Sequence, residues 1–134
     1  MPALHLSVCL SGEEGDGVTL HLRQSADRLL SCNVAVRAGG FRADLETEMF
    51  VDELRDLQRQ LLRVREDISG MVNFSNELRG LEFTLVMDQT GRAAVEGTAR
   101  DLARGTRLFF TFLTDQSYLA QTVSELTDVL TRLG

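Results

Sequence analysis

The sequence predicts a single α+β domain, 1–134, built from antiparallel β-sheet hairpins and two amphipathic helices. Stretches of alternating apolar and polar residues are joined by short glycine turns, which favours antiparallel pairing. Two other stretches repeat their apolar residues every three or four positions, the period of a helix. The predicted order is ββββ-α-(β)βββ-α, about seven or eight strands, in which the bracketed strand is a short one over residues 71–74.

The chain begins with two alternating segments around a glycine-rich loop. Their apolar residues fall at every second position: Leu4, Leu6, Val8 and Leu10, then Val18, Leu20 and Leu22. This is the period of a strand with one buried face. If Val8 pairs with Leu20, Ser7 lies opposite His21 on the solvent face. The loop is acidic, since it carries Glu13, Glu14 and Asp16.

Gly39-Gly40 separates the next two predicted strands, 28–37 and 41–49, as a two-residue hairpin turn. A hairpin closed there pairs apolar or small residues on one face: Val36 with Ala43, Val34 with Leu45, Cys32 with Thr47 and Leu30 with Met49. The other face is polar. Because the turn and the alternation agree, we predict this register.

Two segments have the helical period. The first helix is predicted over about 51–67, with the stripe Phe50, Leu54, Leu57, Leu61, Val64 and Ile68. The second is predicted over about 116–132, with the stripe Leu119, Val123, Leu126, Leu130 and Leu133. Asp115, directly before the second helix, is its expected N-cap.

A second hairpin is predicted around Gln89-Thr90-Gly91, which fits a type I turn closed by a glycine bulge. Its register places Phe83 opposite Gly97. A third strand, 106–114, then brings Phe110 to the other side of Gly97. We therefore predict that Gly97 makes room for two rings and is not part of a phosphate loop.

The outward face of this three-stranded unit carries an apolar row, Val86, Ala94 and Leu113, with Phe109 nearby. Monomers rarely leave such rows bare, so we expect the N-terminal strands to cover the row in a sandwich-like arrangement. The alternative is a contact surface for another chain. In that case Val86, Ala94, Phe109 and Leu113 form a homodimer patch.

Composition excludes several functions. All 14 basic residues are Arg, which excludes a Schiff-base lysine, a Walker lysine and a Ser-Lys dyad. The net charge of −6 has the wrong sign for binding a nucleic-acid backbone. No apolar run approaches the roughly 18 residues of a membrane span. The opening residues lack the basic start of a signal peptide, and two cysteines are too few for a disulfide framework. We expect free thiols and a cytoplasmic protein.

His5, Cys9 and His21 are the candidate metal ligands, because they lie out of phase with the buried leucines. His5 and Cys9 are four residues apart on one strand, or about 13 Å, whereas zinc bonds measure about 2.0–2.3 Å. At most two of the three therefore reach one ion. A nucleophilic pair of Cys9 and His21 lacks an orienting third group. We predict no metal, no cofactor, no catalytic residue and no enzymatic activity.

Two groups of acids are the candidate partner-binding residues: Asp44, Glu46 and Glu48, then Glu13, Glu14 and Asp16. The first three have period two, so on a strand they form a row about 13 Å long on one side. The row is either a solvated sheet face or a docking strip that speeds association with a basic partner. The loop acids do not match the spacing of an EF-hand.

Two segments carry a resemblance to a known family. One is the hairpin Val34-Ala35-Val36-Arg37-Ala38-Gly39-Gly40-Phe41-Arg42-Ala43, followed by a helix that begins near Val51-Asp52-Glu53-Leu54. The other is the aromatic strand and capped helix of Leu108-Phe109-Phe110-Thr111-Phe112-Leu113-Thr114-Asp115-Gln116-Ser117-Tyr118-Leu119. Together they resemble the WapI-type immunity proteins, small cytoplasmic partners in bacterial polymorphic toxin systems, over about residues 28–133.

The resemblance implies a non-catalytic protein that occludes a cognate toxin, and the acids would then meet a basic toxin face. Two other interpretations stay open. One is a homodimeric interaction module that uses the apolar row and has a different role. The other is a carrier of a small apolar ligand, with a pocket lined by Phe83, Phe110 and Phe112.

Overall fold

Two four-stranded antiparallel sheets, each followed by one helix, make up the chain, and the computed structural model describes residues 5–133. The first half comprises β1 (His5–Ser11), the 3₁₀ helix η1 (Glu13–Gly15), β2 (Gly17–Ala26), β3 (Leu29–Ala38), β4 (Phe41–Phe50) and α1 (Val51–Asp67). The second half comprises β5 (Gly70–Ser75), β6 (Leu81–Met87), β7 (Arg92–Asp101), β8 (Thr106–Asp115) and α2 (Gln116–Leu133). The predicted α+β class and element order are confirmed, with the bracketed strand present as β5.

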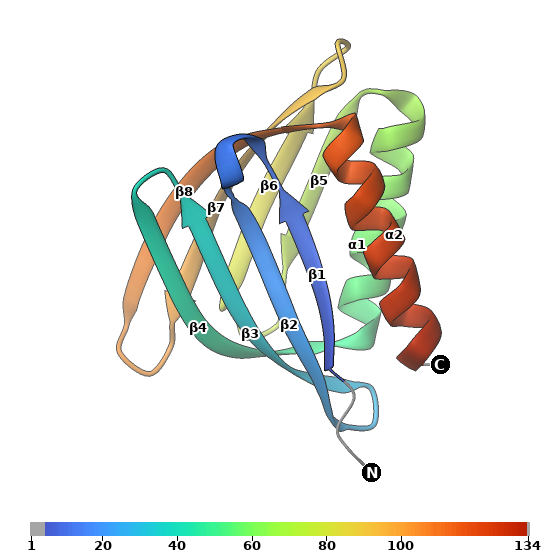
Figure 1. Cartoon of the computed structure of the whole chain (residues 1–134). Helices are drawn as coiled ribbons and strands as arrows, with labels where there is room; N and C mark the ends of the chain where they lie inside the picture. Colours follow the sequence, from blue (N-terminus) through green and yellow to red (C-terminus); the bar gives the residue numbers. More distant parts are fainter. Residues whose placement is uncertain (1–4, 134) are drawn as a thin grey trace.

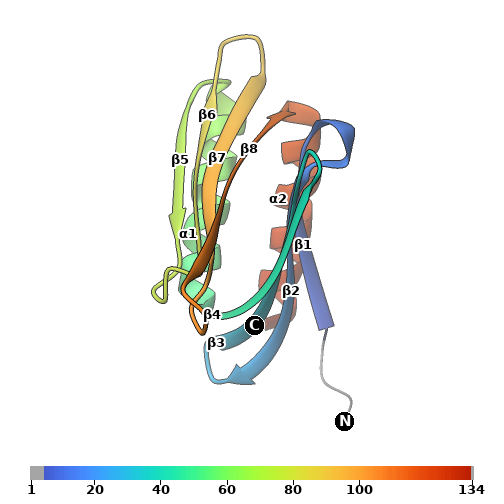
Figure 2. The ribbon, with the colours of Figure 1, turned by 90° about the vertical axis from the view of Figure 1, so that its left-hand side faces the viewer.

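The two sheets face each other, and both helices lie along one side of the pair (Figures 1 and 2). α1 packs on β5, α2 packs on β1, and the helices contact each other. The apolar faces of all these elements share one core. On the side away from the helices, the edge strands are β4 in the first sheet and β8 in the second (Figure 2).

The predicted strand registers are confirmed in both sheets. β3 and β4 pair around the glycine turn as expected, with Val34 opposite Leu45. β1 and β2 place Ser7 opposite His21; Leu4, which was expected to begin this alternation, lies outside the described residues. In β1 to β4 these pairings put the predicted apolar residues, such as Val8, Leu20, Val34 and Leu45, on the inward face.

Gly97 has the packing role that the sequence predicts, with Phe83 and Phe110 as its neighbours across the sheet. A Cβ added to Gly97 would lie 2.5 Å from Cζ of Phe110, 2.9 Å from Cβ of Phe83 and 2.6 Å from the carbonyl oxygen of Glu82. All three distances are shorter than van der Waals contact. The two rings and the neighbouring strand can therefore pack this closely only because residue 97 is a glycine.

α1 has the predicted bounds, but both ends of its predicted apolar stripe are wrong. Phe50 is 41% exposed and Ile68 is 40% exposed. Phe50 is the N-cap, with extended backbone, and Ile68 ends the helix at a φ of 51°. Neither residue has helical dihedrals, so neither points in the direction of the stripe. The inward stripe begins instead with Val51.

α2 begins at the predicted N-cap. A carboxylate oxygen of Asp115 accepts hydrogen bonds from the backbone N–H groups of Ser117 and Tyr118, at 2.9 and 3.2 Å. These bonds satisfy two of the free donors in the first turn. Within residues 5–133, no helix combines the length and the apolarity that a bilayer crossing needs.

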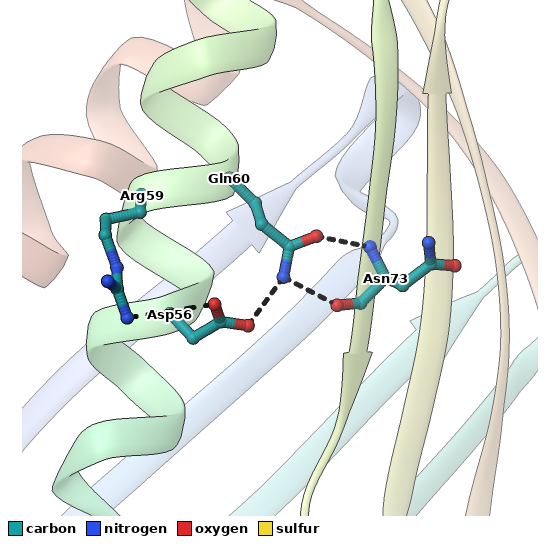
Figure 3. Close-up of polar contacts among 4 residues, drawn as sticks. All are labelled: Asp56, Arg59, Gln60 and Asn73. Carbon is teal, nitrogen blue, oxygen red and sulfur yellow. Dashed lines mark hydrogen bonds and ion pairs between the residues drawn. The ribbon is translucent and has the colours of Figure 1, made fainter.

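Side chains of the helices take the place of a neighbouring strand at two of the four sheet edges. At β5, the side-chain amide of Gln60 donates to the carbonyl oxygen of Asn73 and accepts from its N–H, both at 2.8 Å (Figure 3). At β1, Glu125 accepts from the N–H of Cys9 and Thr122 donates to the Cys9 carbonyl oxygen, also at 2.8 Å. These edges offer another strand no free backbone groups at those positions.

Asn76 ties the two sheets together. This residue of the β5–β6 loop is 1% exposed. Its amide nitrogen donates to Thr47 Oγ1 and to the carbonyl oxygen of Glu48, both at 2.9 Å. Its amide oxygen accepts from the N–H of Leu81 at 3.0 Å. The second half of β4 is thereby held against the second sheet.

Both cysteines are free thiols, as expected, and they lie on opposite faces of the first sheet. Cys32 is 2% exposed, and burial raises the pKa of its thiol to about 12. Cys9 is partly exposed on the outer face, where its sulfur lies 3.1 Å from Ser11 Oγ and 3.2 Å from Thr19 Oγ1. The sheet itself separates the two sulfur atoms.

We therefore expect iodoacetamide to label the native protein at Cys9 alone, and to label Cys32 only after unfolding. Cys32 is inaccessible, and its raised pKa keeps it in the unreactive thiol form. Intact-mass spectrometry with and without denaturant measures how many cysteines are alkylated in the unfolded and in the native protein. A Cys9→Ser variant should stay unlabelled in its native state, and alkylation of Cys32 in that variant would contradict the structure.

Candidate functional site

The acids of β4 form a row along the outer face of the first sheet. Asp44, Glu46 and Glu48 are exposed, and they alternate with the buried Leu45 and Thr47. Successive carboxylates start about 7 Å apart along the strand. Within the described part of the chain, none of the three forms an ion pair. This acidic strip (Asp44, Glu46 and Glu48) therefore faces solvent without a cationic partner among the described residues.

Two shallow depressions, each of about 570 Å³, border the acidic strip. The lining of the first includes Cys9, Asp16, Arg37, Arg42, Asp44 and Tyr118. The lining of the second includes His21, Asn33, Glu46, Glu48 and, from loops of the second sheet, Leu78 and Leu102. The acidic strip thus runs past two hollows in which a partner's side chains can be seated.

Of the three acids in the β1–β2 loop, the structure brings only Asp16 close to the acidic strip. Asp16 lines the same depression as Asp44, but one of its carboxylate oxygens accepts from the N–H of Gly39 at 3.0 Å. Asp16 therefore links the β1–β2 loop to the β3–β4 turn. Glu13 and Glu14 are exposed on η1 and line neither depression.

The residues considered for metal binding or nucleophilic chemistry do not converge. His21 Nδ1 lies 3.2 Å from Ser7 Oγ, the neighbour predicted from register. Cys9 contacts hydroxyl groups and not His21. The side chain of His5 lies outside the described residues. Among the residues that the structure describes, no three His, Cys, Asp or Glu side chains are grouped to hold a metal ion.

One row across the outer face of the second sheet is apolar on all four strands. The registers place Met71 beside Val86, Val86 beside Ala94, and Ala94 beside Leu113. Met71, Val86 and Leu113 are 55%, 47% and 54% exposed. The expectation that the N-terminal strands cover this row is wrong, because those strands pack against the inward face of the sheet (Figure 2).

Phe109 lies on β8 four residues before Leu113, on the same outer face, and its side chain is 70% exposed. The guanidinium of Arg107 stands over its ring, 5.3 Å from the ring centre. This residue and the apolar row leave the outer face of the second sheet much less polar than that of the first.

The part of the core between the sheets beside the helices is closely packed. The void there measures about 10 Å³, close to the room that one water molecule needs, and core residues such as Leu20 and Leu61 line it. Phe83, Phe110 and Phe112 are all buried in this core. A depression of about 780 Å³ lies on the second sheet around Gly97, and its lining includes Phe83 and Phe110 of the three predicted pocket residues, but not Phe112. The void of about 10 Å³ is too small for a carried apolar ligand.

A family model described as "Immunity protein WapI-like family" matches residues 9–134. The chain belongs to this family. The match confirms the resemblance seen in the hairpin and in the strand–helix junction. Membership in the WapI-like family suggests a toxin-neutralising binding role with a protein partner, and the family is generally non-catalytic.

The other comparisons add little to the WapI-like assignment. No curated protein matches the chain. A solved structure described as "Crystal structures of trypanosoma bruciei MRP1/MRP2" is similar at 14% identity and a TM-score of 0.49, over 99% of this chain and 84% of that chain. At this level of similarity we draw no functional inference from it.

Met71 was not included in the apolar row predicted from the sequence of this WapI-like protein. Met71 completes the row, but no short turn fixes the pairing of β5 with β6, because residues 76–80 form a five-residue connection. The local signal for this strand is the alternation of the buried Val72 and Phe74 with exposed neighbours. That alternation places Met71 on the outward face, but it does not predict that Met71 lies beside Val86.

Proposed function

We propose that this WapI-like protein is a non-catalytic immunity protein that neutralises a cognate toxin by occlusion, with the acidic strip bound to a basic surface of the toxin. The observation that carries the proposal is the family match, which implies a protein partner. The strip supplies the surface, since its carboxylates are exposed and have no cationic partner in the described chain.

Charge supports the proposal in two ways. The net charge of −6 draws a basic partner toward the molecule as a whole. The acidic strip then concentrates negative charge beside two hollows, so that oppositely charged side chains can be oriented on contact. Glu13 and Glu14, which lie on the neighbouring loop outside both depressions, would meet the partner at the margin of this surface, and Asp16 adds its charge while it holds the β3–β4 turn.

The cellular setting of this proposal is the cytoplasm. An immunity protein of this kind protects the cell in which it is made, and the two free thiols fit a reducing compartment. Occlusion needs no catalytic residue on the immunity protein. It needs a rigid surface, which the doubly layered sheet provides.

The test is a triple variant, Asp44→Asn, Glu46→Gln and Glu48→Gln, titrated against the purified domain of the cognate toxin. We expect the affinity to fall by about 10- to 100-fold, mainly through slower association, and the salt dependence of binding to weaken. Stopped-flow association rates at two ionic strengths, with isothermal titration calorimetry, measure both effects.

A matched control removes the same number of charges elsewhere. Asp27, Glu66 and Asp67 are exposed and make no side-chain hydrogen bond or ion pair within the described chain. Asp27→Asn, Glu66→Gln and Asp67→Asn should leave the affinity within about twofold. Equal losses in both triple variants, or no loss in the strip variant, would refute the role of the strip while leaving toxin binding itself intact.

A further inference from the structure

The four sheet edges are not equally protected. At β1 and β5, side chains from the helices bind the backbone groups of Cys9 and Asn73. At β4, Asn76 binds the carbonyl oxygen of Glu48, and the exposed side chains from Arg42 to Glu48 are charged. Charged side chains on an edge strand discourage the addition of another strand. Among residues 5–133, no side chain binds the outward backbone groups of β8 from Arg107 to Thr111, and within that stretch only Arg107 is charged.

The hydrogen-bond pattern shows which groups of β8 are free. The N–H of Asp88 donates to the carbonyl oxygen of Arg92 at 2.8 Å, so even-numbered residues of β7 bond to β6. Opposite residues in an antiparallel ladder alternate between bonded and non-bonded pairs. The odd-numbered residues of β7 therefore bond to β8, through its even-numbered residues. This leaves the backbone groups of Arg107, Phe109 and Thr111 directed to the open edge.

The open part of this edge is short, and Arg107 is the one charged residue on it. At the far end, Gly12 covers the strand, since a Cβ on Gly12 would lie 2.5 Å from the carbonyl oxygen of Leu113. From Leu108 to Thr114 the strand has no charged residue and consists of Leu, Phe and Thr. Such a sequence on an uncovered edge favours pairing with another strand.

We propose that a second copy of this chain occupies the edge, with the two β8 strands paired antiparallel about a two-fold axis at Phe109. This register places Phe109 opposite Phe109 of the second copy and Arg107 opposite Thr111 of the second copy. The free N–H and C=O groups of all three residues are then bonded. No like charges stand opposite each other, and the two exposed rings cover one another.

The pairing joins the two β5–β8 sheets into one eight-stranded sheet. Of the residues in the predicted homodimer patch, Phe109 lies at the contact and Leu113 beside it, while Val86 and Ala94 stay outside it. The contact is smaller than the roughly 800 Å² per partner of a standard interface. We therefore expect a reversible dimer with a dissociation constant of about 10 μM or weaker. The proposal is independent of the proposed immunity function.

The first experiment is sedimentation equilibrium over a wide range of protein concentration. The wild-type mass should rise from 14.9 kDa toward twice that value. Thr111→Pro should stay monomeric, because it removes an N–H that faces the open edge and no bond to β7. Thr111→Ala retains the N–H and should dimerise like the wild type. A monomeric wild type at every concentration, or a Thr111→Pro variant that dimerises like Thr111→Ala, would overturn the proposal.

A crosslinking experiment tests the register without relying on the proline variant. In a Cys9→Ser background, Phe109→Cys places two thiols on the two-fold axis, where Cα atoms about 5.5 Å apart fit a disulfide. Leu113→Cys is the control on the same face. Phe109→Cys should form the covalent dimer at least tenfold faster than Leu113→Cys. Faster crosslinking of Leu113→Cys would show face-to-face packing of the apolar rows and refute the strand pairing.

Discussion

An Asn76→Leu variant is expected to lose about 3 to 5 kcal/mol of unfolding free energy, which is a large share of the stability of a domain this size. Leucine has the same branching and the same number of side-chain heavy atoms as asparagine, but no polar atom. It would leave Thr47 Oγ1, the Glu48 carbonyl oxygen and the Leu81 N–H without the partner that Asn76 supplies. Each buried group left unpaired costs about 1 to 3 kcal/mol. Urea denaturation followed by circular dichroism measures the loss.

The matched control for this variant is Asn33→Leu. Asn33 is only partly buried on the outer face of the first sheet and makes no side-chain hydrogen bond within the described residues. The same chemical change there should alter the unfolding free energy by less than about 0.5 kcal/mol. If the two variants were equally stable, Asn76 would not hold the sheets together.

The hydrogen bonds of Asn76 are also an example of contacts that the sequence does not predict. Its partners Thr47 and Glu48 are nearly thirty positions earlier, and nothing in the pattern around residue 76 names them. Gln60 is a similar case, since in the sequence it is one of many polar residues on α1. Its two bonds to Asn73 depend on how the helix docks along the strand. Such contacts are long-range, whereas alternation and turn type are local.

The local patterns were sufficient wherever a short turn joined two strands. Gly39-Gly40 and Gln89-Thr90-Gly91 fixed the registers that place the acidic strip on one face and Gly97 between two rings. The same patterns assigned Val86 and Leu113 to an outward face. They did not predict which face of the second sheet the first sheet covers. Alternation along a strand separates residues into two faces, but it does not identify the element that packs on each face. The expected cover over the apolar row was wrong for this reason.

A Gly97→Ala variant is expected to be destabilised by about 2 to 3 kcal/mol. The added Cβ would meet the ring of Phe110, the Cβ of Phe83 and the carbonyl oxygen of Glu82 at distances under 3.0 Å. The carbonyl belongs to the paired strand β6 and cannot turn away, so the sheet itself must shift. Gly40→Ala is the control, since no atom lies within 4 Å of its added Cβ and its φ is not positive. Thermal and urea unfolding should show Gly40→Ala within about 0.5 kcal/mol of the wild type.

The double variant Gly97→Ala with Phe110→Leu separates the ring clash from the backbone clash. Leucine is shorter than phenylalanine, so removing the ring frees the position 2.5 Å from the new Cβ. The two changes together should then cost less than the sum of the single variants, by about 1 kcal/mol or more. Additive losses would mean that the Glu82 carbonyl and the Cβ of Phe83, and not the ring of Phe110, set the requirement for glycine. A stable Gly97→Ala variant would mean that the sheet has slack at this position, contrary to the close packing seen on both sides of it.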